Sequence, residues 1–285
     1  MILSKHLVAS LIAAATLIGS VAQAGTLDDV RKNGVLRIAY REDAPPFSYK
    51  KEGIVAPVGF MVDLCRAVAD GLARQIGMAD LKVTYVPVTS TNRFDAITGD
   101  KADLLCEATT ATLRRRESLG FSIATFVDGA SFIIRSTGPK DIGAMAGHKI
   151  AVLAGTTTEE DLRRALAAAK VDADISLMPT HQEGLDAVEK GAIVAYFADR
   201  AILTSLLQSG GRPAGSLALA DTYLSIEPYA LAMKRGDEDF RLAVDTQLSR
   251  IYRSGEIAKL FAATFGPARP SPMLLGLFTT SALPQ

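Results

Sequence analysis

The chain has 285 residues, of which 48% are hydrophobic and 22% are charged, a composition typical of a globular protein with a sizeable core. Its 31 lysine and arginine residues equal its 31 aspartate and glutamate residues, so no overall field favours nucleic acid or an anionic membrane. Recognition of a charged ligand must therefore rest on a few placed side chains. Three histidines and two cysteines offer little material for a metal site, and no metal or cofactor is expected.

The first 24 residues have the pattern of a secretory signal peptide. A short basic start precedes an uncharged apolar run over 7–19, and Ala22-Gln23-Ala24 is a cleavage site of the A-x-A kind. A membrane anchor is the alternative, but the run is shorter than the ~20 residues that span a bilayer. The residue directly after the cut is Gly25 and not a cysteine, so lipid attachment there is not expected. The mature chain is predicted to begin near Gly25 and to lie outside the inner membrane.

Short apolar segments alternate with amphipathic segments in the first half of the mature chain. The helix predicted over 59–76 has apolar residues at helical spacing: Met61, Leu64, Val68, Leu72 and Ile76. The other elements expected here are strands over 36–40, 81–88 and 102–106 and a short helix over 92–97. Such alternation implies parallel β-α units and therefore an α/β fold.

The alternation continues in a second block, which begins near residue 131, and in a final stretch from residue 228. The expected strands are 132–134, 149–153, 174–178, 192–197 and 229–233, and the expected helices are 157–169, 237–253 and 255–265. No repeat or low-complexity linker divides the chain. Two lobes joined by strand hinges and one large α/β domain both fit this pattern.

The two cysteines, Cys65 and Cys106, both lie in the mature chain. In an exported protein such a pair is expected to form a disulfide, here between the first large helix and the end of a nearby strand. The alternative is a pair of buried thiols, because free cysteine packs like a small hydrophobic residue.

Four polar segments follow predicted strands directly, at 40–48, 89–93, 106–116 and 155–160. Ligands of open α/β sheets bind at this place, beyond the carboxyl ends of the strands. The segments are rich in arginine, whose planar guanidinium meets a carboxylate through two hydrogen bonds, and in threonine, which adds hydroxyl donors. They predict an anion-binding site. The alternative is that each arginine is a surface charge and each threonine a helix cap.

The last of these segments also begins a helix. Thr156 or Thr157 is expected to cap it, and Glu159 or Glu160 to complete a capping box. The start of such a helix presents free N–H groups and a partial positive charge to an anion.

Six groups of residues occur along the chain in the order found in one known family. They are Arg41 ahead of Pro46-Phe47-Ser48-Tyr49, Gly59-Phe60-x-Val62-Asp63-Leu64-Cys65, Pro87-Val88-Thr89-Ser90-x-Asn92-Arg93, Cys106-x-x-Thr109-Thr110 with Arg115, Phe121-Ser122, and Gly155-Thr156-Thr157. From Gly25 to about Pro270 the chain resembles the periplasmic solute-binding proteins of polar amino acid ABC transporters (family 3). Within that family it resembles most the glutamate/aspartate-binding branch.

The resemblance implies a two-lobed α/β periplasmic binding protein of type II, with a central ligand cleft and two strand hinges. The implied division is a signal peptide over 1–24, lobe 1 over 25–129, lobe 2 over 130–227, and a return to lobe 1 with a C-terminal tail over 228–285. The implied function is to bind glutamate or aspartate in the periplasm, close the lobes and deliver the ligand to an inner-membrane ABC transporter permease. Such a protein is a monomer, is not an enzyme and binds no nucleic acid.

The resemblance also implies which residues hold the backbone groups of the amino acid. The α-carboxylate is assigned to Arg115, helped by Thr110 and by the helix start at Thr156 and Thr157. The α-ammonium is assigned to Asp199, for which the alternative is a solvated loop acid.

The side-chain carboxylate of the ligand is assigned by the same resemblance to Arg41, Ser90 and Arg93. His181 falls where the branch places a ligand-contacting histidine, although it fits the first residue of a helix equally well. Two positive charges at this end favour glutamate or aspartate over their neutral amides.

Three positions depart from the pattern of the branch. Glu107 stands where a glycine is usual, Ala108 where a serine is common, and Arg200 where an acid follows Asp199. Glu107 would either neutralise Arg93 or Arg115 or point to solvent, so these positions bear on side-chain specificity more than on recognition of the α-amino acid. A different polar amino acid is the alternative ligand.

Two other functions are alternatives to simple binding. A dehydratase-like enzyme on this scaffold needs a general acid or base at the ligand, which Glu107 or His181 would have to supply. No recognisable motif offers a pair of carboxylates for that task. The ligand-sensing domain of a receptor is usually tethered by a membrane segment, and none is predicted after residue 24.

Overall fold

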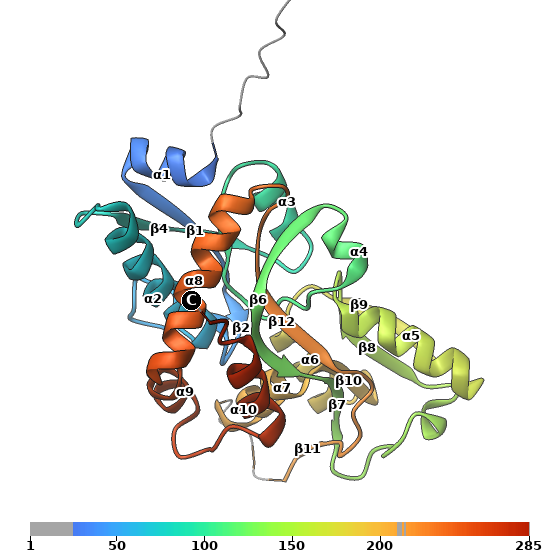
Figure 1. Ribbon diagram of the computed structural model, residues 1–285. Coiled ribbons are helices and arrows are strands. Elements are labelled where there is room, and N and C mark those ends of the chain that lie inside the picture. The colour runs from blue at the N-terminus through green and yellow to red at the C-terminus, as the bar shows by residue number, and fades with distance from the viewer. Residues whose placement is uncertain (1–24, 210–212, 214, 285) are drawn as a thin grey trace, which may run out of the picture.

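The computed structural model describes residues 25–209, 213 and 215–284, and the predicted signal peptide lies outside this part of the chain. The described residues form two α/β lobes, each built on a five-stranded sheet (Figure 1). The strand orders are β4-β1-β5-β12-β6 in the first sheet and β11-β7-β10-β8-β9 in the second. The expected two-lobed α/β architecture is confirmed.

The first lobe contains the elements that precede residue 129 and the C-terminal return. Its strands are β1 (Val35–Arg41), β2 (Asp43–Ala44), β3 (Ser48–Tyr49), β4 (Lys82–Val88), β5 (Leu104–Leu105), β6 (Leu119–Asp128) and β12 (Glu227–Lys234). Its helices are α1 (Thr26–Asn33), α2 (Phe60–Ile76), α3 (Arg93–Thr98), α4 (Leu113–Arg116), α8 (Glu238–Ser254), α9 (Glu256–Phe265) and α10 (Pro272–Ser281). Strands β4, β1 and β5 are parallel, whereas β12 runs antiparallel to both β5 and β6.

The second lobe repeats this arrangement with different strands. It contains β7 (Ala130–Arg135), the 3-10 turn η1 (Gly143–Met145), β8 (Lys149–Leu153), α5 (Thr157–Ala169), β9 (Asp174–Met178), α6 (His181–Glu189), β10 (Ala195–Asp199), α7 (Arg200–Ser209) and β11 (Leu217–Leu219). Strands β9, β8 and β10 are parallel, β7 runs antiparallel to β10, and β11 runs antiparallel to β7. The carboxyl ends of the parallel strands in each lobe carry the polar segments singled out in the sequence.

The chain crosses between the lobes twice, from β6 to β7 and from β11 to β12. The two crossings lie side by side, because Asp128 at the end of β6 pairs with Glu227 at the start of β12. Gly129 joins β6 to β7, and a Cβ atom there would overlap the carbonyl oxygen of Ser225 on the other crossing. This close approach of two backbones requires glycine.

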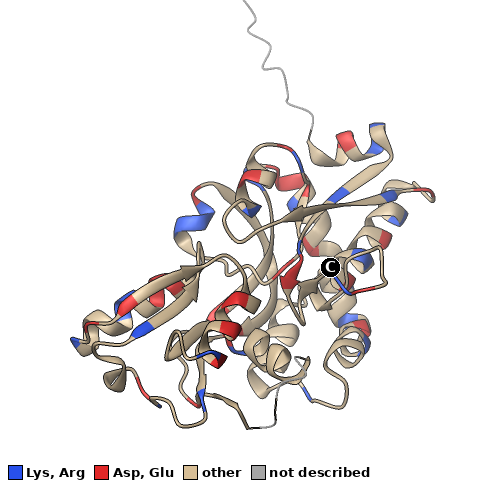
Figure 2. Ribbon diagram, turned by 180° about the vertical axis from the view of Figure 1, so that it is seen from behind, with Lys and Arg blue, Asp and Glu red and all other residues tan. Residues whose placement is uncertain are grey.

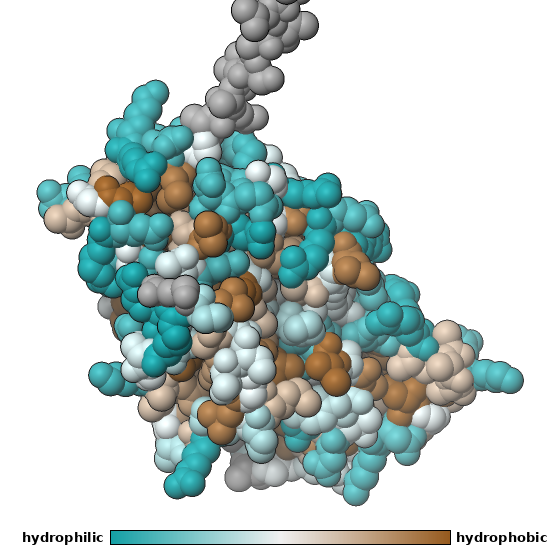
Figure 3. Space-filling view, in the orientation of Figure 1, coloured by the Kyte–Doolittle hydropathy of each residue, from teal (hydrophilic) through white to brown (hydrophobic). Residues whose placement is uncertain are grey.

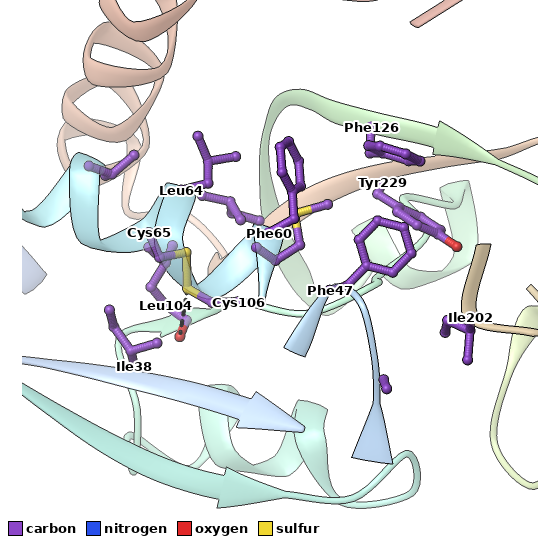
Figure 4. Packing of buried hydrophobic residues seen from close by; sticks show 14 of the residues in the cluster. Ile38, Phe47, Phe60, Leu64, Cys65, Leu104, Cys106, Phe126, Ile202 and Tyr229 are labelled. Carbon is purple, nitrogen blue, oxygen red and sulfur yellow. Dashed lines mark hydrogen bonds between the residues drawn. A yellow bond between two sulfur atoms is a disulfide. The ribbon is translucent and has the colours of Figure 1, made fainter. Parts of the chain in front are cut away.

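An aromatic cluster fixes the β2–β3 loop against the crossing strands (Figure 4). Phe47 from the loop lies edge-on to Phe126 of β6 and Tyr229 of β12, with ring centroids 4.9 Å and 5.4 Å away. Such edge-to-face pairs add stabilisation beyond the apolar area that they bury. Phe47 is therefore a core residue of the first lobe.

The disulfide between Cys65 and Cys106 is present, as predicted. It joins the buried face of α2 to the residue that follows β5, next to Leu64 and Leu104 (Figure 4). Cys106 begins the polar segment over 106–116, which includes Glu107 and Thr110, so the bridge anchors the start of this segment.

Two predicted strands differ from the structure in their bounds, and several elements were not predicted: β2, β3, β6, β11, α1, α4, α6, α7 and α10. The strand expected over 192–197 is β10, Ala195–Asp199, because the N–H groups of Ala192 and Ile193 bond to Ala187 and close the end of α6 instead. The strand expected over 102–106 is reduced to Leu104–Leu105. The ten-residue strand β6 was not predicted, because its buried and half-buried residues do not follow the period of two that marks a strand.

The outer surface mixes charges and apolar groups. Acidic and basic residues are interspersed over both lobes (Figure 2), and on the face of Figure 3 apolar side chains are scattered among hydrophilic ones. No helix among the described residues is long and apolar enough to cross a membrane.

The disulfide generates a stability prediction. Its loop spans 41 residues, so replacing both cysteines by alanine should lower the free energy of unfolding by about 3–4 kcal/mol in a loop-closure model. Urea unfolding of the oxidised wild type, the reduced wild type and the double variant measures this. The reduced wild type should approach the variant. Two free thiols in protein taken from an oxidising compartment would contradict the bridge.

Candidate functional site

A small cavity lies between the two lobes, where the polar segments of both meet. Eight of the nine predicted ligand-binding residues line it: Arg41, Arg93, Thr110, Arg115, Thr156, Thr157, His181 and Asp199. Ser90, the ninth, is buried but does not line the cavity. The cavity measures ≈ 20 Å³, which is room for about one water molecule, so the lobes are closed over it. A larger open groove of ≈ 1180 Å³ beside α1 and α8 contains none of these nine residues.

The lining residues reach the cavity because they stand at the ends of parallel strands. In the first lobe Arg41 ends β1 and Arg93 begins α3 after β4. In the second lobe Thr156 follows β8, His181 begins α6 after β9, and Asp199 ends β10. The carboxyl edges of the two sheets therefore face each other across the cavity.

The second lobe presents the start of α5 to the cavity. Thr156 is the N-cap, and its hydroxyl accepts a hydrogen bond from the N–H of Glu159 at 3.3 Å. Thr157, the first helical residue, lies 3.2 Å from the hydroxyl of Thr110 in the other lobe and donates to Glu227 at 2.9 Å. The threonine cap predicted from sequence is therefore present and the helix start faces the first lobe, but Glu159 accepts the N–H of Gly155 rather than that of the N-cap, so the predicted capping box is not formed.

Arg115 on α4 lies opposite this helix start. Its Nη1 donates to the carbonyl of Thr110 at 2.9 Å, and its guanidinium lies 5.0 Å from the ring centroid of Phe94. Desolvation lowers the pKa of Arg115, while Glu107 and Glu227 oppose the shift. Arginine stays charged under such conditions, so Arg115 is a fixed cation at the cavity.

Arg41 pairs with Asp43, a residue that sequence reasoning did not single out. Both Nε and Nη2 of Arg41 donate to Asp43 Oδ1, at 2.8 Å and 2.5 Å. The other carboxylate oxygen accepts the backbone N–H of His181 at 3.4 Å. Desolvation acts to raise the pKa of Asp43, but Arg41 and His181 outweigh it and lower the pKa. Asp43 is therefore a charged partner that joins Arg41 to the second lobe.

His181 is a neutral, buried hydrogen-bonding residue of the cavity wall. It is both the first residue of α6 and a lining residue, so the two alternatives for it coexist. Its Nδ1 lies 2.8 Å from the hydroxyl of Tyr196, and its buried Nε2 has no hydrogen-bond partner among the described residues. Desolvation and the charge of Arg41 lower the pKa of His181 to about 3.

Glu107 lines the cavity and pairs with Arg93. Of the alternatives that the sequence left open, neutralisation of Arg93 or Arg115 or a side chain in solvent, the structure shows the pair with Arg93. Glu107 Oε1 lies 3.4 Å from Arg93 Nε and also accepts the hydroxyl of Thr109. Arg93 Nη2 donates to the carbonyl of Gly155 in the other lobe at 3.1 Å. Desolvation lowers the pKa of Arg93 to about 10, with Glu107 opposing the shift. Arg93 Nε and Glu107 Oε1 are within ion-pair distance, but no hydrogen bond forms between them.

Three carboxyl groups gather where the lobes join. Asp199 accepts the hydroxyl of Thr158 at 3.2 Å, and desolvation with repulsion from Glu227 and Asp128 raises its pKa to about 8. Desolvation likewise raises the pKa of Asp128 to about 6, although the N–H of Ala201 donates to it. Asp199 is therefore a half-buried, desolvated acid at the cavity rather than a solvated loop residue.

Arg200, which follows Asp199, does not contribute to the cavity. Its guanidinium donates to the carbonyl of Ala220 and lies 5.0 Å from the ring centroid of Tyr223. The Arg200 side chain, at one of the three positions that depart from the family pattern, therefore does not line the cavity.

Two α/β lobes that close over a cavity with an arginine, a helix start and a half-buried acid define a small-molecule binding protein. Residues 36–267 match the bacterial extracellular solute-binding proteins, family 3. The chain belongs to this family.

Individual relatives agree with this assignment. The chain is 28% identical to an L-glutamate/L-aspartate-binding protein of Pseudomonas aeruginosa over 93% of this chain and 87% of that one. It is 29% identical to a glutamate/aspartate import solute-binding protein of Salmonella typhimurium, over 87% and 82%. Among solved structures, an ancestral amino acid-binding protein described as a precursor of cyclohexadienyl dehydratase superposes with a TM-score of 0.73, at 25% identity over 84% and 98%.

The raised pKa of Asp199 generates a prediction about pH. The unfolded chain loses this proton near pH 4, whereas the folded protein keeps it until about pH 8. Protonated Asp199 therefore contributes its full share to the free energy of unfolding of the ligand-free protein at low pH. This contribution falls as the pH rises from about 4 to about 8. Asp199→Asn should therefore gain more than about 1 kcal/mol relative to the wild type between pH 5 and pH 8. Urea unfolding across this range measures it, with Asp174→Asn, an exposed acid of the same lobe, as the control; equal slopes for wild type and Asp199→Asn would contradict it.

Proposed function

We propose that this protein binds a free α-amino acid with a polar side chain in the cavity and delivers it to the permease of an inner-membrane ABC importer. An α-amino acid carries a carboxylate beside an ammonium group. The cavity offers a complement to each, from opposite lobes: Arg115 with the start of α5 for the carboxylate, and Asp199 for the ammonium. This pairing of a cation and an acid across one small cavity is the observation that carries the proposal.

The side chain of the ligand extends towards Arg41, Arg93 and His181. All three are buried and line the same cavity. Glutamate, aspartate and their amides are the side chains that such hydrogen-bonding groups can hold. The names of the Pseudomonas and Salmonella relatives support this class of ligand.

Binding requires the lobes to separate, because the cavity of this ligand-free closed form is smaller than an amino acid, and then to close around the ligand. The crossings at β6–β7 and β11–β12 are the hinges, which divide the chain into lobe 1 over 25–129 and 228–285 and lobe 2 over 130–227. The ligand shifts the population towards the closed form by the contacts that it makes only there. That closed form is what the permease recognises.

The protein works as a monomer in the periplasm, after removal of a signal peptide that ends near Ala24. The sequence pattern of residues 1–24 and the extracellular family support this location.

Catalysis is the competing function, favoured by one observation: the ancestral structural relative is described as a precursor of cyclohexadienyl dehydratase. Glu107 and Asp199 are acids at the cavity, but each is already engaged, Glu107 by Arg93 and Thr109, and Asp199 by Thr158. We therefore expect no turnover when the protein is incubated with prephenate and the products are followed by absorbance. Turnover that Glu107→Gln or Asp199→Asn abolishes would make the protein an enzyme.

The binding proposal is tested at Arg115. A thermal-shift screen over the twenty amino acids and small dicarboxylates first identifies the tightest ligand. Arg115→Ala should weaken that ligand by several kcal/mol, because it leaves a buried carboxylate without its charged partner. Calorimetry measures the loss. Arg114→Ala is the matched control, since the Arg114 side chain is 83% exposed and pairs with Glu160. Near-normal affinity of Arg115→Ala would remove this residue from the site.

A further inference from the structure

Glu107 is an acid at the predicted side-chain end of the cavity. It is 1% exposed, lines the cavity and follows the disulfide-bonded Cys106. Its carboxylate faces Arg93, one of the two guanidinium groups assigned to the ligand side chain. A carboxylate in this position occupies the place that a ligand carboxylate would take on Arg93.

The guanidinium groups of the cavity are not equally available to a ligand. Arg41 is held by Asp43 through two hydrogen bonds, and Arg93 is held by Glu107. Arg115 donates to a backbone carbonyl, and no carboxylate lies within ion-pair distance of it among the described residues. The cavity therefore contains one arginine in need of an anion, which matches one ligand carboxylate rather than two.

The mixed pair of Arg93 and Glu107 also has a hydrogen-bonding preference. An amide can accept a hydrogen bond from a guanidinium through its oxygen and donate one to a carboxylate through its nitrogen. A carboxylate only accepts, and beside Glu107 it would place two like charges together in a desolvated site. Selection by such a repulsive element is a general way to exclude a close analogue.

We propose that Glu107 is a specificity-determining residue: it satisfies Arg93 in place of the ligand, so that the side-chain end of the cavity selects an amide over a carboxylate. The proposal rests on the amino acid binding proposed above and names the ligands within it as glutamine or asparagine. Glu107 and Arg93 act together as an acceptor and a donor for the two ends of the amide group.

The experiment compares acid and amide on the same protein. Calorimetry gives the dissociation constants of glutamate, glutamine, aspartate and asparagine for the wild type and for Glu107→Gln. The wild type should bind the better amide at least as tightly as its acid. In Glu107→Gln the ratio of affinities should move towards the acid by at least about tenfold, because Arg93 is then left to the ligand. Glu160→Gln is the matched control: Glu160 is 61% exposed, pairs with Arg114 and should leave the ratio unchanged.

Three results would overturn the proposal. The first is a wild type that binds the acid more tightly than its amide. The second is a ratio that stays the same in Glu107→Gln, including an equal loss for acid and amide, which would assign Glu107 to the α-ammonium group that both share. The third, no binding of any amino acid, would overturn the proposed function as well. If Glu107→Gln does not fold, the wild-type ratio alone decides.

Discussion

The cleft between the lobes buries guanidinium and carboxylate groups together, and each of them needs a partner because unpaired charge in such a place costs several kcal/mol. Arg41 finds Asp43 and Arg93 finds Glu107, each through a residue only a few positions from a strand end. His181 avoids the problem by staying neutral. Arg115 is left as the cation without a carboxylate partner among the described residues, so charge balance itself marks the place for an anion.

The crossing strands connect this balance to the movement of the lobes. Asp128 and Glu227 face each other in register on the two crossings, and Glu227 accepts the hydroxyl of Thr157 at the start of α5. The charges of Glu227 and Asp128 both raise the pKa of Asp199. An ammonium group that enters beside Asp199 would relieve this repulsion, because a cation next to a carboxylate favours its charged form. Asp128, Asp199 and Glu227 therefore connect the proposed binding of the ammonium group to the strands that cross between the lobes.

The sequence was sufficient to predict elements that depend on neighbouring residues. It was not sufficient to predict contacts between residues that lie far apart in the chain. Strand 149–153 and helix 157–169 were predicted with their observed bounds, because apolar periodicity and a threonine cap are local signals. Six of the eight predicted residues that line the cavity lie in the polar segments after predicted strands, whereas His181 and Asp199 were assigned by the family resemblance alone. Asp43 was missed because its role depends on Arg41 and on His181, which is 138 positions away in the chain. Glu227 was missed for the same reason, since only the pairing of β12 with β6 brings it to Thr157.

The contacts that already join the lobes show what the ligand must add. Arg93 donates to the carbonyl of Gly155, the hydroxyls of Thr110 and Thr157 meet, and Asp43 accepts the N–H of His181. Hydrogen bonds of this kind contribute about 1 kcal/mol each, somewhat more where one partner is charged. A zwitterion held by Arg115 on one lobe and Asp199 on the other adds charge-assisted contacts that exist only when both lobes reach it. Because a ligand shifts an equilibrium only by its differential affinity for the two states, this bridging across the cavity would drive closure in the function proposed above.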